Sequence, residues 1–279
     1  MEKAMMVDDL RKLTNVENQY QRLYYGQEFC PRTFLTVREL KSVISFCEQH
    51  DMKLTLITPY MTDESMNTIV NILKEVSEAS IFDELVVNDF GMLYFIENHY
   101  PGRFKLILGR LLNKAKKSPS IANYFPKLDD DSKSALQNTA GGFVPNIRFM
   151  RKYKISAIQY DNRIQGNKLD IKDNHDLVNN NDIDDADTDV LPFSRELVYP
   201  YVHITTARRC FSSILYSKSS MSEWKTSSLC NKSCKTCQTV LYNDVMKKDI
   251  ILKGNSLYYE NAKLPVNLAE YSRIITQVL

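Results

Sequence analysis

Glycine is scarce in this sequence: only 8 of its 279 residues are Gly, and no G-x-G-x-x-G or Walker-type loop occurs. Such loops let a backbone approach the phosphates of a nucleotide, so the sequence gives no support to a nucleotide site of the Rossmann or P-loop kind. Long apolar runs are also missing, and the N-terminal segment carries charges throughout. The sequence therefore predicts no membrane span and no secretory signal, and we expect a cytoplasmic protein.

The chain has almost no excess of charge of either sign. Its 36 Lys and Arg residues against 34 Asp and Glu residues leave a net charge of +2, which gives no general electrostatic reason to bind nucleic acid or anionic lipid. One basic cluster, Lys114, Lys116 and Lys117, stands alone, whereas an RNA surface needs several basic stripes with aromatic platforms. We therefore expect a small-molecule substrate rather than a nucleic acid.

Apolar periodicity predicts helices and strands in alternation. Residues 37–50 place Leu40, Val43 and Cys47 on one helical stripe, and a second amphipathic helix is predicted over roughly 64–78. Short, mostly buried strands are predicted at 53–60, 83–89, 103–110, 152–162 and 196–206. This alternation favours an α/β fold with a TIM-like barrel, incomplete or irregular in places and carrying loop insertions. An open doubly wound sheet is the alternative.

Two polar stretches interrupt this pattern within what we expect to be a single barrel domain, residues 1–279. Residues 114–142 and 163–192 are predicted excursions from the barrel rim, and the second is an Asp/Asn-rich insertion that we expect to be mobile. Three acidic residues in it, together with one just beyond it, fall at positions of a calcium loop, but Val190 stands where that loop needs Gly. A solvated loop is therefore the favoured interpretation. The four acidic residues are Asp185, Asp187, Asp189 and Glu196.

The cysteines give the sharpest signal. Three of the six crowd into the segment C-N-K-S-C-K-T-C at 230–237, and Cys210 precedes them within A-R-R-C. Thiolates at such spacing suit zinc or an iron–sulfur cluster, and spacing alone does not choose the metal. A redox pair at Cys234 and Cys237 is an alternative, but this C-x-x-C does not open a helix after a strand as in thioredoxin. An unliganded chance cluster is the remaining interpretation.

Several motifs in order along the chain resemble peptidase family U32. Residues 24–62 are similar to its strand that ends in G-x-x-x-C and is followed by a helix and a strand, and 83–99 are similar to its strand ending in D-x-G before a helix. TTARRCFSS (205–213) resembles its S-A-R-C-F motif, CNKSC its C-x-x-x-C, and IILKGNSLYY (250–259) its L-N-G-I-Q segment. The likeness is greatest to the UbiV-type branch of O2-independent ubiquinone-biosynthesis proteins.

This resemblance implies a TIM-like barrel that carries a 4Fe-4S cluster. Its four ligands would be Cys30, Cys210, Cys230 and Cys234, with Cys237 as a spare or alternate ligand. It also implies an anaerobic enzyme subunit supporting O2-independent hydroxylation, or a related redox modification, of a small, partly aromatic or isoprenoid substrate. A second U32-family subunit would complete a heterodimer. This sequence departs from the family where L-N-G reads L-K-G and in a longer linker after Cys210.

Four polar residues are candidates for catalysis beside the cysteines. Asp89 and Asp161 end predicted strands, where barrel enzymes collect their catalytic groups, although an Asp before Phe-Gly is also ordinary turn chemistry. His203 lies within a predicted strand as an acid or base, or as a hydrogen-bonded core residue. Arg208 offers a planar fork for a carboxylate or phosphate, or pairs with an acid at the rim. We expect them to bound one pocket at the carboxyl ends of the strands, with the cluster near its wall.

Other function classes stay open at this point. Other members of the resembled family hydroxylate RNA, which requires a basic groove. The family name implies proteolysis, but the sequence has no evident Ser/His/Asp or H-E-x-x-H arrangement. A non-catalytic binding protein is the third alternative, in which zinc or a cluster only staples the C-terminal third.

Overall fold

Eight parallel strands form a closed barrel in the computed structural model, which describes residues 1–15, 19–78, 82–169, 193–216, 230 and 232–279. Around the barrel the strands follow the order β1-β12-β7-β6-β5-β4-β3-β2. The closed barrel confirms the TIM-like α/β class and rules out the open doubly wound sheet. The strands are β1 (Glu2–Val7), β2 (Arg22–Gly26), β3 (Lys53–Ile57), β4 (Phe82–Val87), β5 (Lys105–Leu108), β6 (Ile155–Asp161), β7 (Ser194–Tyr199) and β12 (Arg273–Gln277).

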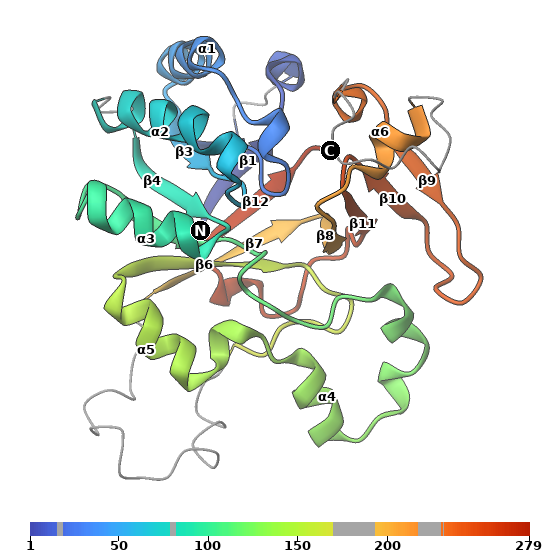
Figure 1. Cartoon of the computed structure of the whole chain (residues 1–279). Coiled ribbons are helices and arrows are strands. Elements are labelled where there is room, and N and C mark those ends of the chain that lie inside the picture. The colour runs from blue at the N-terminus through green and yellow to red at the C-terminus, as the bar shows by residue number, and fades with distance from the viewer. Residues whose placement is uncertain (16–18, 79–81, 170–192, 217–229, 231) are drawn as a thin grey trace.

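Helices cover the barrel along one part of its circumference (Figure 1). They connect successive strands from β2 to β6: α1 (Val37–Gln49), α2 (Asp63–Glu78), α3 (Phe90–His99) and α5 (Val144–Lys152). A capping box between Thr36 and Glu39 starts α1, and its predicted stripe, Leu40, Val43 and Cys47, is buried. Between β1 and β2 the described residues hold only the 3-10 helix η1 (Leu10–Asn15), so the barrel is irregular there. No helix among the described residues is long and apolar enough to cross a membrane.

A second sheet extends from the carboxyl end of β7. It is antiparallel, in the order β8-β11-β10-β9, and lies beside the barrel in Figure 1. The prediction of one strand over 196–206 was wrong, because the chain leaves the barrel at Pro200 and enters the second sheet. Its elements are β8 (Tyr201–Thr206), α6 (Phe211–Tyr216), β9 (Thr239–Leu241), β10 (Ile250–Lys253) and β11 (Ser256–Glu260). The chain then returns to close the barrel as β12.

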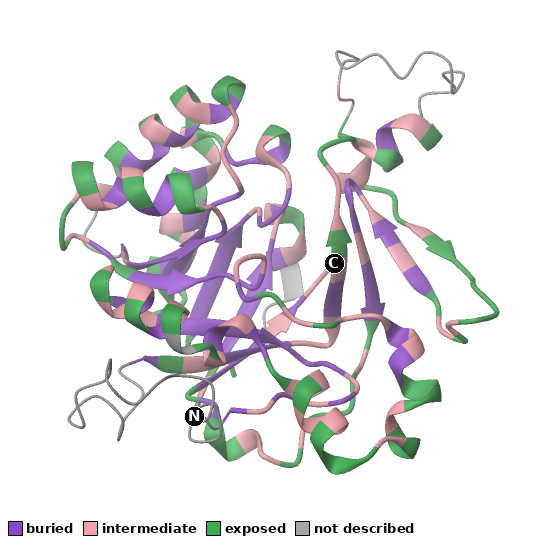
Figure 2. Ribbon diagram, turned by 60° about the horizontal axis from the view of Figure 1, so that its bottom comes forward, coloured by how far each residue is buried: buried purple, intermediate pink, exposed green. Residues whose placement is uncertain are grey.

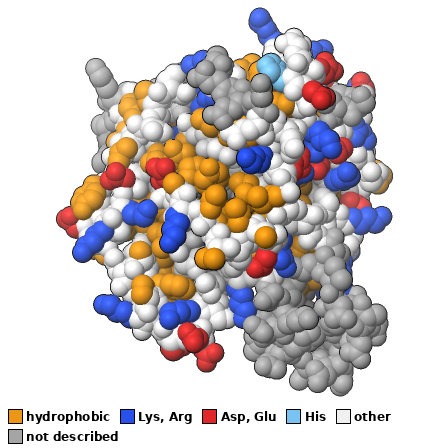
Figure 3. Space-filling view, turned by 180° about the vertical axis from the view of Figure 1, so that it is seen from behind, with side chains coloured by type: hydrophobic (Ala, Val, Ile, Leu, Met, Phe, Trp, Pro, Cys, Tyr) orange, Lys and Arg blue, Asp and Glu red, His pale blue; other side chains and the backbone are white. Residues whose placement is uncertain are grey.

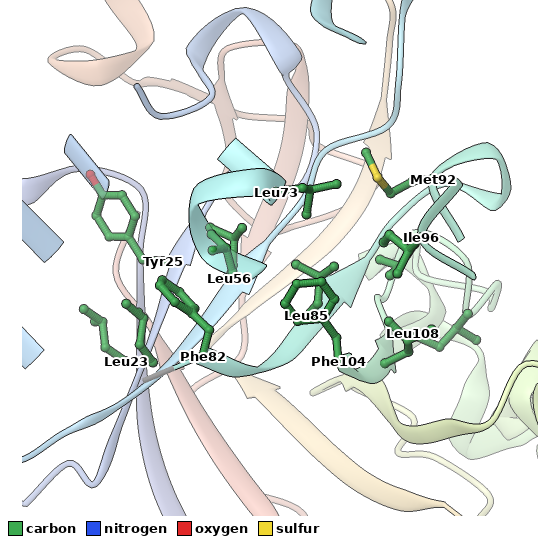
Figure 4. Packing of buried hydrophobic residues seen from close by; sticks show 14 of the residues in the cluster. Leu23, Tyr25, Leu56, Leu73, Phe82, Leu85, Met92, Ile96, Phe104 and Leu108 are labelled. Carbon is green, nitrogen blue, oxygen red and sulfur yellow. The ribbon is translucent and has the colours of Figure 1, made fainter. Parts of the chain in front are cut away.

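Strand alternation divides the buried side chains into two groups. Outward-facing residues such as Leu23, Leu56 and Leu85 pack against the helices, as Figure 4 shows. Inward-facing residues form a separate cluster inside the barrel, which includes Ile57 and Val86. The barrel strands are the most continuously buried part of the molecule in Figure 2, whereas the edge strand β9 is largely exposed.

The two polar stretches differ in outcome. Residues 114–142 do leave the rim between β5 and α5, as short helices: η3 (Pro119–Asn123), η4 (Phe125–Lys127), α4 (Asp130–Gln137) and η5 (Ala140–Gly142). In the stretch 163–192, residues 163–169 are packed, with Arg163 and Asn167 buried, and 170–192 lie outside the described residues. Glu196 belongs to β7 and pairs with Arg273 inside the barrel, so it is not placed as a calcium ligand.

Candidate metal centre

Four of the six free cysteines come together at the carboxyl end of the barrel. Cys30 follows β2, and Cys210 lies between β8 and α6. Cys234 lies in the 3-10 helix η9 (Ser233–Lys235), and its thiol is close enough to those of Cys30, Cys210 and Cys230 for their charges to affect it. All four are partly buried, whereas Cys237 is exposed. Chain segments far apart in sequence thus bring four thiols together. We call these four, Cys30, Cys210, Cys230 and Cys234, the thiol cluster.

Two thiols of this cluster, those of Cys210 and Cys234, have raised pKa values. Burial, together with negative charge on Cys210, Cys30 and Cys230, raises the pKa of the Cys234 thiol to about 12, against the opposing charge of Lys253. Burial likewise raises the pKa of Cys210, although the backbone N–H of Ser213 donates to its Sγ at 3.3 Å. A bound metal would reverse this balance, because thiolates are stabilised by a cation between them.

The donor set fits a thiolate-ligated metal group. Four thiols are the ligands that structural zinc and 4Fe-4S clusters use. Within the described ranges no three His, Cys, Asp or Glu side chains are already arranged around one ion position. A single zinc needs its sulfurs at about 2.3 Å from one point, whereas a cubane presents four irons to sulfurs that lie further apart. The donor chemistry of the thiol cluster is therefore compatible with either group.

Two pockets meet at Cys30 and Asn255, which line both. The inner pocket lies at the barrel mouth, with Cys234 and Glu28 among its lining residues. The outer pocket is lined by Cys210 and Cys230 together with several charged and polar side chains. These are Arg32, Tyr60, Thr62, Asp63, Glu64, Ser65, Thr68, Arg208 and Lys232. The thiol cluster thus borders both pockets.

Arg208 and Tyr60 bring ionisable groups to the outer pocket. Arg208, a residue predicted from the sequence, is exposed there beside three of the cysteines. Burial raises the pKa of the Tyr60 phenol, as does negative charge on Cys30, while the guanidinium groups of Arg208 and Arg32 oppose the rise. Sequence reasoning missed Tyr60, although it ends the predicted strand 53–60 and so follows β3 at the carboxyl end.

Asp161 lies in a buried network beneath the mouth of the barrel. Arg110, with 0% of its surface exposed, donates to Asp161 Oδ1 at 3.0 Å and to both oxygens of Glu28 at 2.8 and 2.7 Å. Lys117 Nζ lies 2.6 Å from Asp161 Oδ2. Burial alone would raise the pKa of Asp161, but the charges of Lys117 and Arg110 lower it to about 2. Asp161 is therefore ionised and held by cations.

His203 contacts the same network but is not charged. Its backbone N–H donates to Asp161 Oδ1 at 3.0 Å, and its ring stacks on Phe29 with centroids 4.0 Å apart. Burial and the charge of Lys117 lower its pKa well below the usual value. Its Nε2 has no hydrogen-bond partner within the described part of the chain. His203 thus supports the loop that leads to Cys30.

Asp89 is placed at the carboxyl end of β4, as predicted, where it caps a helix. Its Oδ1 accepts from the backbone N–H of Met92 at 3.0 Å at the start of α3. It lines neither of the two pockets at the thiol cluster. The structure therefore brings Arg208 to the cysteines and joins Asp161 to His203, but it does not add Asp89 to either group.

An irregular parallel α/β barrel with a thiol cluster at its carboxyl end is the class that the fold and the site define. No family model matches the sequence, and no curated protein matches it. Among solved structures, the whole chain aligns with 92% of the U32 peptidase Mk0906, at 7% sequence identity and a TM-score of 0.47. The TIM-like class rests on the closed barrel itself.

Proposed function

We propose that the chain is an iron–sulfur protein in which Cys30, Cys210, Cys230 and Cys234 hold a 4Fe-4S cluster. The observation that carries this proposal is the convergence of these four thiols, with Cys237 left exposed. The motif resemblance to family U32 supports the same ligand set. On that resemblance, the protein supports O2-independent hydroxylation, or a related redox modification, of a small, partly aromatic or isoprenoid substrate, together with a second U32-type subunit, in the cytoplasm.

The outer pocket is the proposed substrate site, because it combines the thiol cluster with groups that bind and orient. When bound, the cluster supplies one-electron chemistry at the pocket wall. Arg208 has the planar fork that binds a carboxylate or phosphate of a substrate. Tyr60 keeps its proton, because burial raises its pKa, so its Oη donates a hydrogen bond to a substrate oxygen. Asp161 and His203 act from beneath, through the loop of Cys30.

A zinc centre that only fastens the C-terminal segment is the second candidate. The observation in its favour is the all-thiol donor set, which zinc also accepts. Binding of RNA has less support: on the face shown in Figure 3, Lys and Arg side chains are interspersed with acidic ones around a hydrophobic area. This face therefore presents no basic groove of the kind that RNA needs.

The absorption spectrum and metal content of anaerobically purified protein test the proposal. We expect a brown protein with about four irons and four sulfides per chain. Cys210→Ala and Cys234→Ala should lose the iron, while the matched variant Cys237→Ala, three residues from Cys234, should keep it. If Cys237→Ala loses iron and Cys30→Ala keeps it, the ligands are the four C-terminal cysteines. A colourless protein with one zinc per chain would establish the second candidate.

A further inference from the structure

The turn between β10 and β11, residues 254–255, touches three of the four cysteine-bearing segments, and the proposed function does not yet use it. We propose that Asn255 is a positioning residue that ties the loop of Cys30 to the loop of Cys210, and that Gly254 seats Cys234 beside them. The purpose of this positioning, to hold a metal cluster, rests on the proposed function. Its test does not, because the test uses the metal-free protein.

The side chain of Asn255 joins two distant segments. Its Nδ2 donates to the carbonyl oxygen of Phe29 at 2.6 Å and to that of Ala207 at 2.8 Å. Phe29 immediately precedes Cys30, and Ala207 lies three residues before Cys210. Because both partners are acceptors, the amide nitrogen must face them, which settles the orientation of the side chain. Both hydrogen bonds that Nδ2 donates are thus made to segments that lead to a cysteine.

The backbone of the same turn accepts hydrogen bonds from residues on both sides of Cys210. The N–H of Ala207 donates to Asn255 O at 2.9 Å, and the N–H of Ser212 donates to Gly254 O at 3.0 Å. Cys210 lies between these two anchors. Its own Sγ accepts from the N–H of Ser213. The position of Cys210 is therefore set by the turn as well as by β8.

Gly254 gives the turn its close contact with Cys234. Its φ of +64° is in the left-handed region, which favours glycine. A Cβ at this position would lie 3.5 Å from Cys234 Cβ and 3.6 Å from its Sγ. A side chain any larger than a methyl group would thus meet the thiol. Glycine is thus required here by the positive φ of the turn, and Cys234 packs directly against it.

A hairpin turn needs none of the side-chain contacts of Asn255. Gly254 alone supplies the positive φ, and the strands β10 and β11 pair through their own backbone. The buried amide, 5% exposed, instead reaches segments 226 and 48 residues away. The two hydrogen bonds that its Nδ2 donates thus connect the cysteine loops rather than the strands of the hairpin.

Thiol cross-linking of the metal-free protein tests this role without any cluster. The probe is dibromobimane, a short bifunctional thiol reagent, and mass spectrometry of the digested protein measures the yield of the Cys30–Cys210 link. We expect Asn255→Ala to lower that yield by about fivefold, because two hydrogen bonds that fix the loops are lost. Asn255→Asp should do the same, because a carboxylate donates to neither carbonyl. Gly254→Ala should lower the links of Cys234 and leave the Cys30–Cys210 link intact.

The matched control is Asn261→Ala. Asn261 lies just after β11 and donates to the carbonyl oxygen of Asn162 at 2.8 Å, so it also loses an amide-to-carbonyl bond, but away from the cysteines. Its cross-linking should equal that of the wild type. Unchanged Cys30–Cys210 linking in a folded Asn255→Ala protein would overturn the proposal. If that variant does not fold, the isosteric Asn255→Asp serves instead, because it removes the same two donor bonds; unchanged linking there would overturn the proposal equally.

Reconstitution with iron and sulfide then separates the two proposals. If the wild type takes up no iron while Asn255→Ala still loses cross-linking, the proposed cluster fails and the positioning role stands. If the wild type takes up a cluster, we expect Asn255→Ala to bind less iron and to change the electron paramagnetic resonance signal of the reduced cluster. An identical signal and iron content in Asn255→Ala would overturn the positioning role and leave the cluster proposal intact.

Discussion

Both ends of the barrel contain buried ion pairs. Those at the amino end join barrel strands to one another, whereas those at the carboxyl end also bind a loop and the second sheet. At the amino end, Arg273 bonds Glu84 at 2.9 Å and pairs with Glu2 and Glu196, and all four residues belong to barrel strands. At the carboxyl end, Arg110 bonds the loop residue Glu28 and donates to the carbonyl oxygen of Tyr201 in the second sheet at 2.8 Å.

This difference separates stability from function in physical terms. A network confined to barrel strands can stabilise the barrel, but it does not position a loop, because it binds none. The carboxyl-end network holds Glu28, two residues before Cys30, and fastens the second sheet that carries Cys210. We infer that the amino end serves the fold, whereas the carboxyl end also positions the thiol cluster. In barrel enzymes generally, the carboxyl end is where active sites lie.

Loss of Arg110 should have the largest effect of any single change at either end. In Arg110→Met the carboxylates of Glu28 and Asp161 stay buried with fewer cations, and breaking such a pair costs about 3–5 kcal/mol. We expect urea unfolding to show that loss, and cross-linking between Cys30 and Cys210 to fall with it. Unchanged cross-linking in a folded variant would contradict a positioning role for this network.

Arg273→Met is the matched change at the amino end. It leaves Glu84 and Glu196 without their shared guanidinium, so we expect a stability loss of about 3 kcal/mol. The thiols lie at the other end of the barrel, and their cross-linking and iron uptake should equal those of the wild type in the folded protein. If Arg273→Met disturbs the thiols as much as Arg110→Met does, the division between the two ends is wrong.

A fall in pH should change the stability contributed by the two ends in opposite directions. The pKa of Asp161 is lowered to about 2 by Lys117 and Arg110 despite its burial. Its stabilisation is therefore present above its unfolded pKa and is lost as the pH falls toward 2. Burial raises the pKa of Glu196, so its contribution is present below its unfolded pKa and is lost as the pH rises through the folded pKa.

The pH dependence of unfolding in Asp161→Asn and Glu196→Gln measures this contrast. Between about pH 4 and pH 2 the wild type should lose about 2 kcal/mol more than Asp161→Asn loses over the same interval. Above about pH 4.5, Glu196→Gln should lose less stability with rising pH than the wild type does. Parallel curves for all three proteins would show that neither carboxyl group is coupled to folding in this way.

Local patterns predicted most of the barrel. The stripe of Leu40, Val43 and Cys47 predicted α1, and the apolar runs at 53–60 and 83–89 predicted β3 and β4. These predictions succeeded because helix and strand periodicity are local properties. The division of 196–206 between two sheets was not predictable in the same way. Both halves are apolar runs, and only the long-range pairing of β7 with β12 and of β8 with β11 separates them.

The site was predictable to a smaller extent. The crowding of Cys230 and Cys234 is visible in the sequence, and Asp161 was correctly placed at a strand end. The partner of Asp161, Arg110, lies 51 residues away on the end of another strand, and no spacing rule connects them. Asn255 carries still less signal, because its two acceptors are backbone carbonyls, which every residue has.

Substitution of Asp89 should have the smallest effect on stability. It also tests whether the functional region at the carboxyl end extends beyond the thiol cluster and its two pockets. It lies at that end of the barrel, yet its carboxylate is engaged by the N–H of Met92 at the start of α3. Removal of an N-cap costs about 1 kcal/mol, so Asp89→Ala should lower the free energy of unfolding by about that amount. Asp89→Ser, which keeps a capping oxygen, should restore most of it. If both variants keep iron uptake and substrate conversion, Asp89 acts only as a cap. Loss of conversion in Asp89→Ser, with stability and iron unchanged, would instead give Asp89 the catalytic role that its place at the strand end suggests, and would extend the functional region beyond the thiol cluster and its two pockets.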